Sequence, residues 1–177
     1  MVASTLGTSV AGPFVAACVL LVVSGAGKVA RPAAPRVAVR AAGLPWAGAV
    51  VATFGIVEVA AGVSGAILGG AAAVFVAGCY LALAAFAYRL LRHAPSTPCA
   101  CLGASRAVVT PTHVVLDLAA AAGALVAATS GSPWTQFSGH WIGALTFTAL
   151  IGCCVQLAAL ALDSLPALAA ATKEGSA

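Results

Sequence analysis

Apolar runs of about 20 residues recur along this chain, and they constrain its fold more than any other feature. At 1.5 Å per residue, a helix of about that length crosses the ~30 Å hydrocarbon core of a bilayer. The chain of 177 residues is 62% hydrophobic and 7% charged. Soluble domains carry about 25% charged residues, so the bilayer is the expected solvent. The sequence therefore predicts an all-α, polytopic membrane protein.

Turn and cap residues divide the chain into spans, expected at about 8–27, 45–69, 71–91, 111–130 and 140–162. Thr110 and Pro111 suit the N-cap and first turn of the fourth span. A cleaved signal peptide competes for the first run, but no Lys or Arg precedes it, which favours a retained span.

The expected fold is a four-helix transmembrane bundle with a fifth transmembrane helix added. The bundle domain covers 1–130 and includes a loop at 94–111. The remaining residues, 131–177, hold the fifth helix and a short C-terminal tail. The first connection, which contains proline and several arginines, is expected to be a loop.

Basic residues mark one side of the membrane. With five spans, all eight Lys and Arg fall in the first loop, around the third loop or in the tail, which share a side. The positive-inside rule then places the N-terminus outside and the third loop in the cytoplasm of a bacterial inner (plasma) membrane. No basic and aromatic interleaving indicates nucleic-acid binding, so the lipid bilayer is the expected partner.

The third loop contains Cys99 and Cys101 beside Arg106. A thiolate is the reactive form of cysteine, and nearby cations favour it. A Cys-x-Cys disulfide closes a small, strained ring, which suits thiol–disulfide exchange better than structural bracing. Two incidental loop cysteines remain an alternative interpretation.

A metal site is the other alternative for this loop. His93 and His113 flank the two cysteines, and thiolate with imidazole suits Zn or Cu. The spacing fits no common zinc pattern, so no metal or cofactor is assigned. A structural membrane subunit without thiol chemistry is a third possibility, and whether the chain is an enzyme stays open.

Glu58 is the one carboxylate deep in an expected span. A charge at that depth costs about 2.5–3.5 kcal/mol or more, so Glu58 should face the bundle and be paired or protonated. Lys28 and Arg89 are the candidate partners. We interpret Glu58, Lys28 and Asp117 as polar intramembrane site residues.

Three further residues are candidates. Asp117 lies four residues after His113, so the two share a helix face; it either complements the helix dipole or takes part in the chemistry. Cys153 and Cys154 lie midway along the fifth span and are a possible thiol relay. Buried free cysteine also serves simply as a small apolar side chain.

Several of these motifs together resemble the MauE family, named for methylamine utilisation and related to DoxX-like membrane proteins. The resemblance covers about residues 8–130, and the loop Cys-Ala-Cys-Leu-Gly at 99–103 is similar to the family's Cys-Gly-Cys-Phe-Gly. The other matching positions are Ser24-Gly25-Ala26-Gly27-Lys28, Glu58, Tyr80, Arg89 and the helix-opening His113.

The resemblance implies a four-helix core that helps to mature a redox enzyme or to handle its disulfides. With this role, we predict that Cys99 and Cys101 are the exchanging pair, that Arg106 favours the thiolate and that His113 assists proton transfer. A thioredoxin-like protein, or the redox enzyme being matured, is then the expected protein partner.

Overall fold

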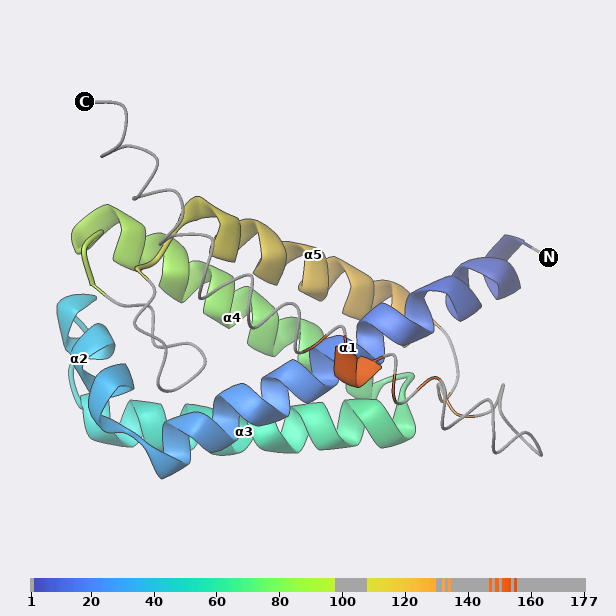
Figure 1. Ribbon diagram of the computed structural model, residues 1–177, viewed down its shortest axis with the longest axis horizontal. Coiled ribbons are helices and arrows are strands. Elements are labelled where there is room, and N and C mark those ends of the chain that lie inside the picture. Colours follow the sequence, from blue (N-terminus) through green and yellow to red (C-terminus); the bar gives the residue numbers. More distant parts are fainter. Residues whose placement is uncertain are drawn as a thin grey trace.

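The computed structural model describes residues 2–97, 108–129, 132, 134, 147, 149, 151–153 and 155. The helices are α1 (Val2–Ala30), α2 (Ala33–Ala41), α3 (Ala47–Leu68), α4 (Ala72–His93) and α5 (Pro111–Ala128). Within the described residues, α1 packs along α3 and α4 packs along α5, while α3–α4 and α1–α5 contacts close the bundle (Figure 1).

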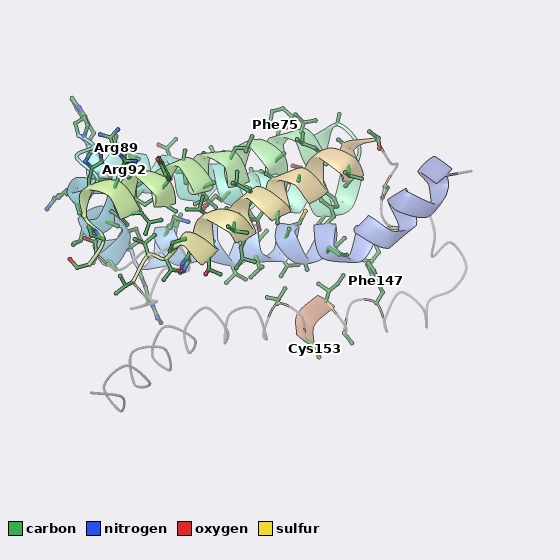
Figure 2. The ribbon with its side chains drawn as sticks, turned by 90° about the horizontal axis from the view of Figure 1, so that it is seen from above. Phe75, Arg89, Arg92, Phe147 and Cys153 are labelled. Atoms are coloured by element: carbon green, nitrogen blue, oxygen red, sulfur yellow. The ribbon has the colours of Figure 1, made fainter. Side chains whose placement is uncertain are left out.

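Four of these helices are long and apolar enough to cross a membrane. The spanning segments are Ala11–Ala30, Ala47–Leu68, Ala72–His93 and Pro111–Ala128. Large apolar side chains on their outer faces are exposed, and Phe75 points outward from α4 (Figure 2). In water such a surface would be unfavourable, whereas lipid tails solvate it. The chain is therefore a multi-pass helical membrane protein, and the expected four-helix core is confirmed.

The expected fifth span, 140–162, falls mostly outside the described residues. A short helical stretch is described around 151–153. There Ile151 is buried in the main core cluster and Val155 packs against that cluster. Phe147 lies near Gly12 of α1. These contacts place the described residues of this segment against the bundle, and a fifth spanning helix stays a prediction.

The helix boundaries follow local chemistry. Gly69 and Gly70 both have positive φ angles, which glycine adopts readily, and they make the tight turn between α3 and α4. Pro111 opens α5 after the Thr110 N-cap. The sequence predicted both of these boundaries correctly, because turn and cap residues act over a few neighbouring positions.

The first connection was expected to be a loop, but this prediction was wrong, because most of the connection forms α2. Pro35, Ala38 and Val39 recur at helical spacing and are buried, while Arg36 and Arg40 are exposed. This amphipathic pattern is that of a helix lying at a membrane interface. Figure 1 shows α2 at the end of the bundle where α3 begins and α4 ends.

Glycines allow α1 and α3 to approach closely. A Cβ added at Gly62 would lie 2.6 Å from the carbonyl oxygen of Cys18, and one at Gly55 would lie 2.9 Å from that of Gly25. Such distances leave no room for a side chain, so glycine is required at both α3 positions for this packing. Because Gly55 meets Gly25 while Gly62 meets Cys18, the two helices run antiparallel.

Candidate functional site

An ion pair lies inside the bundle between α1 and α3. The Nζ atom of Lys28 is 2.8 Å from each carboxylate oxygen of Glu58 and 2.6 Å from the hydroxyl oxygen of Ser24. Glu58 is fully buried, and Lys28 is 7% exposed. Because an unpaired charge in this setting is strongly unfavourable, each of the two groups makes the other tolerable.

Helix geometry brings these groups together. Ser24 and Lys28 are four residues apart on α1 and therefore share a face. Between them, a Cβ at Gly25 would clash with the carbonyl oxygen of Gly55 and would lie 2.9 Å from the Cβ of Glu58. Glycine at position 25 thus lets the backbone carrying the carboxylate come close to α1.

An aromatic ring completes the surroundings of the ammonium group. The Nζ atom of Lys28 lies 5.9 Å from the ring centroid of Phe54, within the range of a cation–π contact. Every buried side-chain nitrogen and oxygen among the described residues has a hydrogen-bond partner. The site is therefore a satisfied polar cluster within an apolar bundle, fixed from both helices.

Arg89, the other candidate partner of Glu58, lies elsewhere. Its Nε donates a hydrogen bond to the carbonyl oxygen of Ala42, at 2.7 Å, just after α2. Arg89 therefore ties α4 to the α2–α3 connection at the basic end of the bundle. The register of α1 against α3 determines that Lys28 is the partner of Glu58. The sequence alone does not predict that register.

A cavity of about 460 Å³ lies between α1, α4 and α5. Most of its wall is apolar, but Ser24, Tyr80, His113 and Asp117 also line it. The hydroxyl of Tyr80 donates to the carbonyl oxygen of Ala17 at 2.7 Å, which links α4 to α1. Because Ser24 lines the cavity and also contacts Lys28, the cavity adjoins the ion pair.

His113 belongs to the N-terminal cap of α5. The backbone N–H of Thr110 donates to Nδ1 of His113 at 3.2 Å, and the Thr110 hydroxyl oxygen lies 2.8 Å from the same nitrogen. The Thr110 side chain in turn faces the backbone of His113. The two residues thus form a capping box in which histidine takes the place usually held by Glu or Gln. Asp117, one turn further along and half-buried, lines the cavity with it.

The Cys-x-Cys loop itself lies outside the described residues, as do Cys99, Cys101 and Arg106. The described residues on either side of it meet, because the backbone N–H of Val109 donates to the carbonyl oxygen of Thr97 at 3.5 Å. Val109 is buried against α2 and α4 residues. The described residues that precede and follow this loop therefore lie side by side.

The other cysteines are free thiols where they are described. Cys18 and Cys79 are buried in the core, whereas Cys153 is exposed. Figure 2 shows Cys153 on the side of its segment facing away from the bundle. Cys154, the other half of the proposed relay, lies outside the described residues. The described cysteines thus bring no second thiol to Cys153.

The described part of the chain contains no group of three or more His, Cys, Asp or Glu able to hold a metal ion. His93 is exposed at the end of α4, and His113 is half-buried at the start of α5. The two cysteines of the metal hypothesis fall outside the described residues.

Ser24 is the residue that our sequence reasoning did not assign a role. Its position four residues before Lys28 was a usable signal, because that spacing places the hydroxyl beside the ammonium on one helix face. Tyr80 entered only through the family resemblance. The bond from its hydroxyl to α1 depends on tertiary packing that no local pattern reports.

The sequence matches the model of one protein family, described as Methylamine utilisation protein MauE, over residues 7–132. The match spans α1 to α5 and the Cys-x-Cys loop. No curated protein and no solved structure matches the chain.

Proposed function

The chain belongs to the MauE family of membrane proteins, and we propose that it supports thiol–disulfide exchange during maturation of a partner redox enzyme. The observation that carries the proposal is the extent of the family match, which includes Cys99 and Cys101. The contact between Thr97 and Val109 supports it, since it brings the described residues on either side of the Cys-x-Cys loop together at one end of the bundle.

The exchange is balanced when the client's thiols are the electron source. A client thiolate attacks one sulfur of a Cys99–Cys101 disulfide, which breaks as a mixed disulfide forms. A second client thiolate attacks that mixed disulfide, so the client gains a disulfide and the chain keeps two thiols. Two protons from the client thiols end on Cys99 and Cys101. Re-oxidation uses the same chemistry with the roles exchanged. The Cys99 and Cys101 thiolates attack the disulfide of a thioredoxin-like protein in turn, so the pair regains its disulfide and the thioredoxin-like protein is left with two thiols.

Two neighbouring residues assist in this proposal. Arg106 supplies positive charge that favours the thiolate form of either cysteine. His113 accepts and returns a proton near the start of α5. Since Nδ1 of His113 is held by Thr110, the exchange would use its Nε2 atom. The Lys28–Glu58 pair holds α1 against α3 and has no electron-transfer step of its own.

The charge distribution supports one orientation in the membrane. Exposed arginines of α2 gather with Arg89 and Arg92 at the end of the bundle where the loop is anchored. The positive-inside rule assigns this end to the cytoplasm of a bacterial inner membrane. The thiol donor or acceptor is then cytoplasmic, whereas a client that folds outside would need the opposite orientation.

The test is thiol labelling in intact cells with a membrane-impermeant maleimide. The reporter chain carries Cys153→Ser and Cys154→Ser, while buried Cys18 and Cys79 remain. The matched control carries Cys99→Ser and Cys101→Ser as well. Labelling that appears only after reduction indicates an exchangeable disulfide. Labelling of intact cells places the two cysteines outside, whereas labelling only of opened cells places them in the cytoplasm. Equal labelling with and without reduction contradicts the proposal.

A trapping variant tests the partner directly. With Cys101→Ser, Cys99 can still attack the disulfide of the thioredoxin-like oxidant, but the mixed disulfide that forms has no Cys101 thiol to resolve it, so a reducible complex with that oxidant should accumulate. Unimpaired client maturation when both cysteines are serine would instead favour a structural subunit without thiol chemistry. Metal bound to purified wild-type chain, and lost in the double variant, would favour the metal-binding alternative.

A further inference from the structure

A groove of about 800 Å³ follows one face of α4, and its lining changes from apolar to basic along the helix. Its inner part is lined by Ala82, Ala85 and Phe86, with Leu44 from the α2–α3 connection. Its outer part is lined by Arg89, Arg92 and His93 at the end of the helix. Figure 2 shows the two arginines together at that end of the bundle.

The length of the groove corresponds to one leaflet of a bilayer. Ala82 lies midway along α4, which runs from Ala72 to His93. The rise from Ala82 to Arg92 is about 15 Å at 1.5 Å per residue, which is half of a ~30 Å hydrocarbon core. The apolar part therefore lies at the depth of acyl chains and the basic part at the depth of headgroups.

The electrostatics of the groove select an anion. The described residues include two acidic side chains, Glu58 and Asp117, and neither lines this groove. Glu58 is already paired with Lys28. The exposed guanidinium groups at the outer end thus present positive charge without an acidic neighbour in the described groove, at the depth where lipid phosphates lie.

The two arginines are also held in place. Nε of Arg89 donates to the carbonyl oxygen of Ala42, and its terminal nitrogens carry further N–H donors. A terminal nitrogen of Arg92 donates to the hydroxyl of Tyr88 at 3.1 Å, and the guanidinium lies 5.9 Å from that ring. Pre-positioned guanidinium groups lose less side-chain freedom when they bind a phosphate in bidentate fashion.

We propose that this groove is a binding site for one anionic phospholipid of the adjoining leaflet. The phosphate and its charged headgroup lie against Arg89, Arg92 and His93, and an acyl chain follows Ala82, Ala85 and Phe86. The site is argued without the thiol chemistry proposed above, since none of the described cysteines lines it.

The test uses the purified full chain in detergent, with native mass spectrometry and thermal unfolding as readouts. Phosphatidylglycerol and phosphatidylcholine with identical acyl chains are added in turn. We expect phosphatidylglycerol to stay bound and to raise the unfolding temperature more than phosphatidylcholine does. Each arginine should contribute about fivefold in affinity, since a basic residue near an anionic surface contributes ~1 kcal/mol. Equal effects of the two lipids would overturn the proposal.

Variants separate the groove from a diffuse basic surface. Arg92→Gln weakens the headgroup contact without removing the Arg89–Ala42 bond, and Ala85→Trp fills the apolar part without changing charge. The matched control is Arg36→Gln with Arg40→Gln, because these exposed arginines lie on α2 and outside the groove. Selectivity lost in the groove variants and kept in the control supports the site. An equal loss in the control assigns the effect to general charge and overturns it.

Discussion

The ammonium of Lys28 lies 2.8 Å from both carboxylate oxygens of Glu58, although the two residues come from different spanning helices. The contact is almost completely shielded from solvent. It joins α1 to α3 at the same level as the close approach of Gly25 and Gly55. Charge pairing and close backbone packing therefore specify one register of the two helices.

Breaking this pair should strongly destabilise the bundle. Lys28→Met or Glu58→Leu leaves one buried charge without its partner, which costs about 3–5 kcal/mol. Replacing both, as Lys28→Met with Glu58→Leu, should lose much less than the sum of the single substitutions. Unfolding in mixed detergent measures all three free energies. Additive losses would show that the two side chains do not act as a pair.

The glycines between α1 and α3 should tolerate no added side chain. In Gly62→Ala the new methyl group meets Cys18 and Val22, and such overpacking costs about 1–3 kcal/mol. Gly78→Ala is the matched control, because an added Cβ at that helical position has nothing within 4 Å. Thermal unfolding in detergent compares them. Equal stability of the two variants would contradict the close approach of the helices.

The hydroxyl of Tyr80 should contribute a measurable link between α4 and α1. Tyr80→Phe removes its 2.7 Å bond to Ala17, for an expected loss of about 0.5–1.5 kcal/mol. Tyr88→Phe is the control, since that exposed hydroxyl bonds only to Arg92 among the contacts in the described region. The free energies of unfolding of the two variants should differ. No loss for Tyr80→Phe would indicate that the freed carbonyl finds another donor.

The cap of α5 should depend on Thr110 and His113 as a unit. Thr110→Val or His113→Ala removes the side-chain part of the cap, at about 1 kcal/mol each. Because both changes break one arrangement, the double variant should cost little more than either alone. Hydrogen exchange at the first turn of α5 reports the loss. Thr129→Val, at the opposite end of α5, should leave that exchange unchanged.

The positions of the spans were predictable from sequence because their signals are local. The Gly69-Gly70 turn and the Thr110-Pro111 start act over a few residues, and the structure confirms both. The α2 helix was missed because its prolines and arginines suggested a loop. The spacing of buried Pro35, Ala38 and Val39 was nevertheless a helical pattern.

The site depends on features that no local pattern contains. The sequence supplied two possible partners for Glu58, but the choice between Lys28 and Arg89 follows from how α1 and α3 interlock. The cavity between α1, α4 and α5 likewise arises from the assembled bundle. The roles of Cys99, Cys101 and Arg106 remain predictions, since they lie outside the described residues.

The buried pair also bears on how the protein is made. Glu58 lies near the middle of α3, where a carboxylate entering lipid alone is opposed by about 2.5–3.5 kcal/mol. Lys28 lies in the last turn of α1, close enough to the interface for its ammonium to remain hydrated. During biosynthesis, α1 can therefore be stable in the membrane before α3 is inserted. In contrast, α3 needs Lys28 of α1 beside it to offset the cost of burying Glu58. We expect α3 to enter the bilayer against α1, so that the order of the helices along the chain is also the order of their insertion.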